Sequence, residues 1–340
     1  MGWAVKLGVV CIDALGWKVV RARWERYLPS AFESVEMFHP EKFGNPALKR
    51  GLRTLAKQLA VRRATETALK SGCDAVLVAT NGEAAMLPLT HASRVAVYGD
   101  ASHRQLNDLY RFGRPERKQR ARERALSRLA AAGAKFIGMS TWCAEGFSRD
   151  YQTQAWTLPP AMDLEAFAFR PNGRERSVLF VGGQFQRKGG STLLELAARP
   201  EWRETPFHLV TGHQKPASPN VHWHPGLTPE SDELRQLFAS SGAFALPTHA
   251  DCTPQAILEA QASGIPVVST LVGGISDLVQ HSRTGWVVTP GSVAELGAAL
   301  RMALESPGEI PAQARARVEK ENDPVAHAAE LRRILTADLT

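Results

Sequence analysis

Short apolar runs alternate with amphipathic stretches along the whole chain, and this alternation limits its fold more than any other feature. In the first half, we predict strands at residues 5–12, 34–38, 74–79, 94–98 and 135–139, with a closing segment at 154–158. The intervening stretches predict helices at residues 15–27, 48–69, 116–132 and 141–149. Strands that alternate with helices favour a parallel, doubly wound α/β sheet with right-handed crossovers.

The second half repeats this pattern after a polar turn at residues 170–176. Its strands are predicted at residues 177–181, 207–210, 242–246, 266–270 and 286–289, and its helices at 189–198, 234–239, 293–304 and 325–337. We therefore predict two Rossmann-like domains, residues 1–170 and 171–320, that face one another across a cleft. Ligands of open α/β sheets are expected at the carboxyl ends of the strands.

Composition places the chain among ordinary globular proteins, with 44% hydrophobic and 22% charged residues in a length of 340. The four cysteines are widely separated and are predicted to be buried free thiols in a reducing compartment. The apolar patch at residues 3–12 is too short and too polar to span a bilayer, and no other run approaches the roughly 18 apolar residues of a membrane helix. A cytoplasmic protein is expected.

The formal net charge of +7 is concentrated in one segment. Between Arg111 and Arg128 the sequence has eight basic and two acidic residues, which supply +6 of that total. One interpretation is a solvated, arginine-rich helix face. The other is a surface that meets anions, such as the headgroups of a membrane or a phosphorylated acceptor. Nucleic acid is disfavoured, because few aromatic residues and no nucleic-acid motif accompany these charges.

The most informative local pattern is the segment ADCTPQAILEAQASGIPVVSTLVGGISDLV in the second half. Asp251 and Glu259 lie eight positions apart in it, across a loop and the helix that follows. Thr253 suits the N-cap of this helix, Pro254 its first position and Gly264 its C-terminal cap. The two carboxylates are candidates for binding sugar hydroxyls.

Two glycine pairs predict a close approach of the backbone to phosphate. Gly273 and Gly274 are expected to offer bare amides at the start of a helix, whose N-terminal end attracts anions. Gly182 and Gly183 follow another predicted strand. Each pair is therefore a candidate for contact with a diphosphate.

Two cations follow the second of these glycine pairs, at Arg187 and Lys188. Positive charges held there would stabilise a diphosphate leaving group in the transition state, and they need no metal ion to do it. The alternative is a strand-end turn with solvated Arg and Lys side chains.

Together these motifs resemble the donor-binding region of retaining glycosyltransferases with the GT-B fold, the family-4 type of glycosyl transferases group 1. That family carries an acidic residue, seven intervening residues, a Glu within Leu-Glu-Ala, a Gly-x-Pro-Val-Val strand and a Gly-Gly turn. The matching elements here are Asp251, Glu259, residues 264–268 and the Gly273-Gly274 pair. The resemblance covers roughly residues 177–305 and implies a nucleotide-diphosphate sugar as donor. It also implies that residues 321–340 form a helix that returns to the first domain.

The resemblance assigns roles residue by residue. Glu259 is expected to bind the ribose hydroxyls of the nucleotide, and Asp251 the hydroxyls of the donor sugar. Lys188 matches the family's Lys near the diphosphate, whereas the usual Arg position is Gly183 here and Arg187 lies beside the Lys. The acid is Asp instead of Glu, and the family's Gly-Phe-Gly after it reads Cys-Thr-Pro, so the sequence does not identify the sugar.

The acceptor is expected in the first domain, where the candidates follow the strand at residues 94–98. Asp100 and His103 would lie at its carboxyl end and could accept the proton of an acceptor hydroxyl. A helix-capping Asp and a bystander His are the alternatives. The loops at residues 13–17 and 81–83 are further candidates for the cleft edge.

The sequence also lacks several signatures. It has no Asp-x-Asp pair for a metal-bound diphosphate, no G-x-G-x-x-G, no P-loop and no G-x-S-x-G elbow, so neither a metal nor a cofactor is predicted. His222 and His224 have no neighbouring carboxylate or thiol in the sequence and are interpreted as strand-end residues.

The sequence-based hypothesis is a retaining, metal-independent glycosyltransferase that transfers to the hydroxyl of a glycan, a lipid-linked molecule or another cell-envelope acceptor. We expect it in the cytoplasm or at the cytoplasmic face of a membrane. The alternatives are a GT-B protein that binds nucleotide sugar or a partner without transfer, a nucleotide-sugar epimerase, or a phosphorylase-like enzyme.

Overall fold

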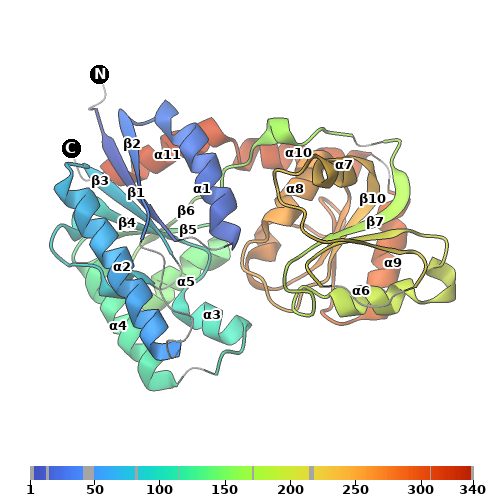
Figure 1. The fold of residues 1–340 in the computed structure, drawn as a ribbon, viewed down its shortest axis with the longest axis horizontal. Coiled ribbons are helices and arrows are strands. Elements are labelled where there is room, and N and C mark those ends of the chain that lie inside the picture. The colour runs from blue at the N-terminus through green and yellow to red at the C-terminus, as the bar shows by residue number, and fades with distance from the viewer. Residues whose placement is uncertain are drawn as a thin grey trace. The chain divides into compact units, whose positions relative to one another are not determined.

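The chain folds into two compact units, described here from a computed structural model (Figure 1). Unit 1 comprises Met1–Ala161 and Pro324–Thr340, and unit 2 comprises Met162–Asp323. The structure describes residues 4–12, 15–40, 50–80, 83–113, 115–170, 172–213, 218–306 and 308–337. Unit 1 is therefore built from both ends of the sequence.

Unit 1 contains a six-stranded parallel sheet of order β2-β1-β3-β4-β5-β6. Its strands are β1 (Lys6–Cys11), β2 (Ser34–Phe38), β3 (Ala75–Ala79), β4 (Val95–Gly99), β5 (Lys135–Gly138) and β6 (Ala155–Thr157). Its helices are α1 (Leu15–Tyr27), α2 (Arg50–Lys70), α3 (His103–Leu109), α4 (Glu116–Ala131), α5 (Thr141–Tyr151) and α11 (Pro324–Thr336), with short 3₁₀ helices η1 (Leu28–Ser30), η2 (Glu83–Met86) and η3 (Ala92–Arg94).

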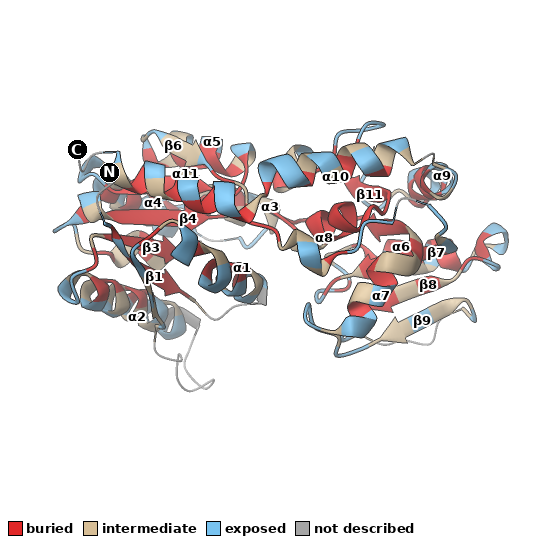
Figure 2. Ribbon diagram, turned by 90° about the horizontal axis from the view of Figure 1, so that it is seen from above, coloured by how far each residue is buried: buried red, intermediate tan, exposed pale blue. Residues whose placement is uncertain are grey.

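Helices cover both faces of this sheet. Side chains of α1 and α11 form one core with the strands, and side chains of α2, α4 and α5 form a second core on the other face. Consequently β3 and β4 are buried along their whole length, as Figure 2 shows in red. A strand covered on both faces needs a nearly continuous apolar sequence, and the AVLVA of β3 has one.

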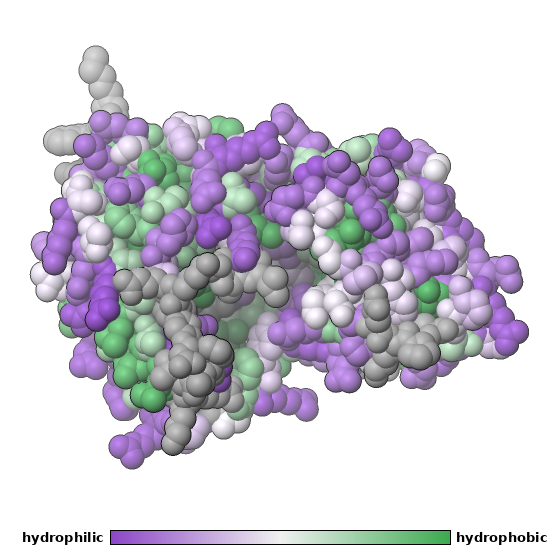
Figure 3. Space-filling model, in the orientation of Figure 1, coloured by the Kyte–Doolittle hydropathy of each residue, from purple (hydrophilic) through white to green (hydrophobic). Residues whose placement is uncertain are grey.

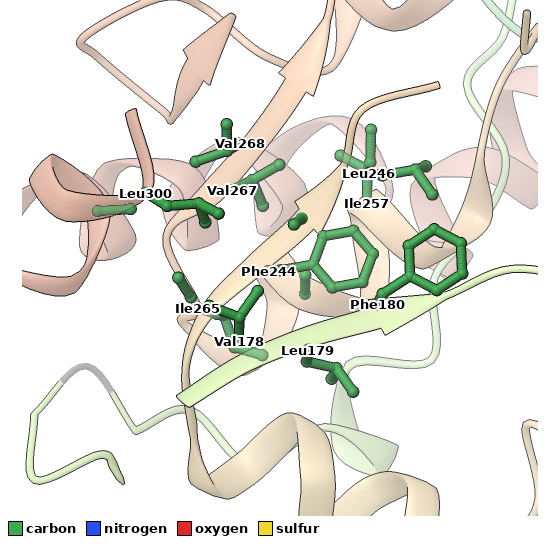
Figure 4. Close-up of a cluster of buried hydrophobic side chains, with 14 of the residues drawn as sticks. Val178, Leu179, Phe180, Phe244, Leu246, Ile257, Ile265, Val267, Val268 and Leu300 are labelled. Atoms are coloured by element: carbon green, nitrogen blue, oxygen red, sulfur yellow. The ribbon is translucent and has the colours of Figure 1, made fainter. Parts of the chain in front are cut away.

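Unit 2 contains a second parallel sheet, of order β12-β11-β10-β7-β8-β9. Its strands are β7 (Glu175–Val181), β8 (Phe207–Val210), β9 (Val221–His224), β10 (Ser241–Leu246), β11 (Val267–Thr270) and β12 (Trp286–Val288). Its helices are α6 (Gly190–Ala197), α7 (Asp232–Ser240), α8 (Gln255–Ser263), α9 (Val293–Leu304) and α10 (Glu309–Glu321), with 3₁₀ helices η4 (Leu164–Ala166), η5 (Pro200–Trp202) and η6 (Gly273–Asp277). Figure 4 shows part of its core, where side chains of β7, β10 and β11 interdigitate.

The predicted α/β class with parallel sheets is confirmed. The predicted thiol state is confirmed as well, because all four cysteines are buried and unpaired with one another. Three elements were not predicted: α3, β9 and α10. The edge strand β9 reads VHWH and is only partly buried, so its sequence lacks the apolar run of the inner strands.

A buried histidine connects α11 to the rest of unit 1. The His327 Nδ1 lies 2.8 Å from the carbonyl oxygen of Pro159, which can only accept, so Nδ1 carries the hydrogen. Its Nε2 accepts a hydrogen bond from the Trp24 indole at 3.1 Å. Burial lowers the pKa of His327 to about 4, so the imidazole stays neutral near pH 7.

Acidification is therefore expected to destabilise unit 1. The folded pKa is about 4, while an unfolded histidine titrates near 6.5, so the unfolded chain binds the proton first. This contribution to stability is complete above about pH 6.5 and is lost towards pH 4, by roughly 3 kcal/mol. Thermal unfolding of wild type and His327→Gln at pH 7.5 and 5 measures it. An equal pH dependence in the two proteins would contradict the assignment.

Candidate functional site

The strand order of unit 2 reverses between β7 and β10, which are parallel neighbours in the sheet. Order β9-β8-β7-β10-β11-β12 is that of Rossmann folds, in which ligands bind outside the carboxyl ends of the strands at this switch point. Lys188 lies in the loop after β7, and Asp251 lies in the loop after β10. The topology thus brings together two of the predicted site residues that are far apart in sequence.

Their side chains form a charged cluster. The Lys188 ammonium donates a hydrogen bond to the Asp251 carboxylate, and these side chains are only 15% and 10% exposed. The Arg187 guanidinium lies 3.7 Å from the same carboxylate and also donates to the carbonyl oxygen of Ala250. Two cations and one anion leave this cluster with a net charge of +1.

Backbone contacts fix the loop that carries the cations. The His249 amide and the Thr248 hydroxyl both donate to the carbonyl oxygen of Arg187, at 2.8 and 3.1 Å. Gly189 has a φ of +84°, and a Cβ on it would lie 2.0 Å from the carbonyl oxygen of Pro247. Only glycine satisfies both conditions, so the Gly189 position joins the two loops tightly.

The two glycines of the Gly182-Gly183 pair differ in their surroundings. The Gly182 amide continues the β7–β8 ladder by donating to the carbonyl oxygen of Val210 at 3.0 Å. A Cβ on Gly182 would lie 3.1 Å from Cγ of Lys188, whereas a Cβ on Gly183 would meet nothing within 4 Å. Gly182 therefore gives the Lys188 side chain its room, and Gly183 faces open space.

Glu259 is a buried member of α8, with 5% of its surface exposed. The predicted C-terminal cap of this helix is confirmed, because Gly264 has a φ of +77°. The predicted N-cap was wrong: Pro254 occupies that position, and the buried Thr253 hydroxyl has no hydrogen-bond partner in the described chain. The helix therefore starts at Gln255, one residue later than predicted.

The expectation of bare amides at the Gly273-Gly274 helix mouth was wrong for Gly274. Gly273 and Gly274 begin a five-residue 3₁₀ helix, and the Gly274 amide donates to the carbonyl oxygen of Cys252 at 2.8 Å. Gly273 has a φ of +58°, and a Cβ there would lie 2.0 Å from the carbonyl oxygen of Asp251. This turn packs against the loop of Asp251 and supports it.

The predicted residues of unit 1 lie after β4. Ser102, not Asp100, caps α3, through a capping box with Gln105. His103 is buried, and its Nε2 lies 3.0 Å from a guanidinium nitrogen of Arg122. A guanidinium only donates, so this Nε2 accepts, and the nitrogen that would take an acceptor's proton is already engaged. The predicted loops at residues 13–17 and 81–83 fall partly outside the described residues.

A chain of histidines lies on the outer strands of unit 2. His224 donates from Nδ1 to the Glu233 carboxylate at 3.0 Å, and its Nε2 lies 3.1 Å from Nδ1 of His208. The absence of a carboxylate near His224, expected from the sequence, was therefore wrong, because α7 supplies one. Burial and the neighbouring histidines lower the pKa of His208 to about 4. Across the described residues, no three His, Cys, Asp or Glu side chains gather as they would around a metal ion.

Comparison of structures defines the class of this fold. Sucrose-phosphate synthase from Thermosynechococcus elongatus superposes with a TM-score of 0.74 at 16% identity, over 98% of each chain. The lipopolysaccharide glycosyltransferase WaaG superposes with a TM-score of 0.70 at 19% identity, over 98% of this chain and 100% of that one. HepE of Anabaena, in complex with UDP-glucose, gives a TM-score of 0.70 at 15% identity, over 98% and 100%. The protein has the GT-B fold.

Sequence comparison finds a family match within unit 2. Residues 175–306 match the model of the family Glycosyl transferases group 1. The lipopolysaccharide glucosyltransferase WaaG of Escherichia coli is 27% identical over 61% of this chain and 62% of its own. Sulfoquinovosyl transferase SQD2 of Arabidopsis thaliana is 38% identical over 23% of this chain and 16% of its own. The alignments thus span less than two thirds of these relatives. Across the described residues, no helix has both the length and the apolarity to cross a bilayer.

Proposed function

We propose that the protein is a retaining, metal-independent glycosyltransferase that moves a sugar from a nucleotide-diphosphate donor to an acceptor hydroxyl. The observation that carries this proposal is the convergence of Lys188, Arg187 and Asp251 at the strand switch point of unit 2. The family of residues 175–306 and the UDP-glucose bound to the similarly folded HepE support it.

In this proposal the donor lies across the loops after β7 and β10. Lys188 and Arg187 bind the diphosphate, whose negative charges compete with the Asp251 carboxylate for the same cations. Asp251 is then available to accept hydrogen bonds from the sugar hydroxyls. Glu259 binds the ribose hydroxyls from α8.

Glycine residues complete the proposed donor site. Gly183, where a Cβ would meet nothing within 4 Å, lets the nucleotide approach the end of β7, and Gly182 leaves room for the Lys188 side chain beside it. Gly273 and Gly274 hold the loop of Asp251 from behind. The donor therefore meets backbone at Gly183 and positive charge at Lys188 and Arg187.

The proposed chemistry is a front-face displacement. The bond between the anomeric carbon and the diphosphate oxygen breaks, the acceptor oxygen bonds to that carbon on the same face, and the acceptor proton passes to the leaving diphosphate. The cations stabilise the charge that develops on the leaving group. Asp100 is the proposed helper in unit 1, whereas His103 must first lose its contact with Arg122 to accept a proton.

Binding of nucleotide sugar without transfer is the second candidate. The engaged Nε2 of His103 favours it, because an unassisted acceptor hydroxyl is a weak nucleophile. The shorter reach of Asp251, relative to the Glu of the family, points the same way.

Contact with an anionic membrane surface at the cytoplasmic face is a further part of the proposal. It rests on the exposed basic residues of α4, which are Arg117, Lys118, Arg120, Arg124 and Arg128. Some of this charge is neutralised within the protein, as in the pair of Arg120 with Glu116.

Nucleotides are expected to stabilise the protein without a metal ion. The measurement is the thermal unfolding temperature with UDP, GDP or ADP in the presence of EDTA. A nucleotide concentration of 100 times Kd stabilises the folded state by about 2.7 kcal/mol, which raises the unfolding temperature by several degrees. Stabilisation by at least one nucleotide supports the donor site. No shift with any of them, with or without magnesium, would refute it, and a shift that requires magnesium would refute metal independence alone.

A further inference from the structure

Unit 1 has a cavity of about 430 Å³ between α2, α4 and the loop that joins α3 to α4. Because α2 leads into β3 and α4 leads into β5, the first turns of both helices lie at the carboxyl edge of the sheet. Figure 1 shows α3 beside those ends of α2 and α4. The cavity is therefore at the edge where an open α/β sheet binds ligands.

The polar side of this cavity is cationic. Lys118 and Arg122 line it, and none of the described lining residues is acidic. The nearby Glu123 is paired with Arg104 at 2.9 Å and so does not neutralise them. Burial lowers the pKa of Arg122, and the nearby Glu83 carboxylate acts in the opposite direction. His103, which also lines the cavity, contacts this guanidinium at 3.0 Å.

The cavity also has an apolar, exposed part. Leu55 and Phe112 line it, although 44% and 40% of their surfaces are accessible. Leu52 and Leu59 are also exposed and lie three and four residues from Leu55, so all three leucines share one face of α2. Figure 3 shows apolar surface in green in the part of unit 1 where Figure 1 places the first turns of α2. An apolar strip thus leads away from the cations.

We propose that this cavity binds the acceptor, and that the acceptor is an amphiphile in which an anionic group such as a phosphate adjoins an apolar chain. Lys118 and Arg122 bind the anion, and the chain lies along Leu55 and Phe112. A guanidinium and an ammonium suit a phosphate, and Leu55 and Phe112 gain from contact with hydrocarbon. That the ligand is the acceptor depends on the proposed glycosyl transfer; the binding itself does not.

Three soluble probes test the binding by calorimetry: octyl phosphate below its micelle concentration, octyl glucoside and inorganic phosphate. Octyl phosphate carries both groups, and each of the others carries one. We expect octyl phosphate to bind at least about tenfold more tightly than either of the others, since a contact worth 1.4 kcal/mol changes Kd tenfold. Equal binding by inorganic phosphate would reduce the cavity to an anion site, and binding by none of them would overturn the proposal.

Matched variants locate the ligand. Lys118→Gln and Arg122→Gln are each expected to weaken octyl phosphate about tenfold, whereas Arg124→Gln, on the same helix but outside the cavity, leaves its Kd unchanged. Leu55→Gln should weaken it and Leu52→Gln should not. Lys118 and Leu55 are exposed, so their variants are expected to fold even if Arg122→Gln does not. Equal losses in the Lys118 and Arg124 variants would show general attraction to a basic surface and overturn the proposal.

Two further measurements distinguish ligand binding in this cavity from the proposed membrane contact and from donor binding in unit 2. Sedimentation with phosphatidylglycerol vesicles reports the membrane contact, and Arg124→Gln is expected to weaken it while octyl phosphate binding persists. Nucleotide-induced stabilisation, measured in the same variants, reports the donor site of unit 2. If wild type binds nucleotide but does not bind octyl phosphate, the assignment of the cavity is refuted and the proposed function still stands. If wild type binds octyl phosphate but no nucleotide stabilises it, the donor site alone is refuted.

Discussion

Replacement of Lys188 by alanine is expected to lower the rate of nucleotide release from the sugar donor by about 10²–10³-fold. The ammonium is the cation in direct contact with Asp251 at the switch point, and in the proposed reaction it faces the charge that develops on the leaving diphosphate. Arg187, 3.7 Å from the same carboxylate, supplies only part of that stabilisation. Initial rates of nucleotide release across a panel of donors measure the effect.

Two controls make this result specific to the position of the charge. Lys188→Arg keeps a cation and should retain more activity than Lys188→Ala. Lys320→Ala removes an exposed cation from α10 of the same unit and should not change the rate. Because Lys188→Ala leaves the Asp251 carboxylate with a more distant partner, the unfolding temperature of this variant shows whether unfolding explains the loss. Equal release from wild type and Lys188→Ala would defeat the assigned role.

Replacement of Glu259 by glutamine is expected to raise the Kd for the nucleotide diphosphate about 100-fold. A carboxylate that accepts two ribose hydroxyls makes charge-assisted hydrogen bonds worth about 1.5–3 kcal/mol each, and glutamine keeps the volume but loses the charge. Calorimetric titration with the nucleotide found to stabilise the protein measures this change.

The matched control for Glu259 is Glu195→Gln, which removes an exposed carboxylate from α6 of the same unit. Its Kd should equal that of wild type. Unchanged affinity in Glu259→Gln, with an unchanged unfolding temperature, would mean that this buried carboxylate has a structural task within α8 and does not contact the ribose.

Most elements were readable from the sequence, because burial on two faces leaves a strong apolar signal. The predicted bounds of α1, β2, β8 and α9 coincide with the structure. The short helix α3 was missed, although Ser102 and Gln105 have the spacing of a capping box that would have marked its start. The charged helix α10 was missed because its apolar positions are few and interrupted.

The candidate site was readable only in part, since a motif specifies residue types but not their contacts. The family pattern predicts Asp251, Glu259 and Lys188 of unit 2. The contact of Arg122 with His103 joins α4 to α3 across nineteen positions, and no local signal encodes it. Likewise, the bond from Gly274 to Cys252 arises only when the loops after β10 and β11 pack together.

The construction of unit 1 from both ends of the chain has a consequence for biosynthesis. Trp24 and Tyr98 form an edge-to-face pair, and both are covered by His327 near the C-terminus. The ribosome synthesises this histidine after the whole of unit 2, so the aromatic surface of the N-terminal sheet stays uncovered until then. Released chains truncated after residue 323 should therefore protect unit 2 from protease and leave unit 1 open to cleavage.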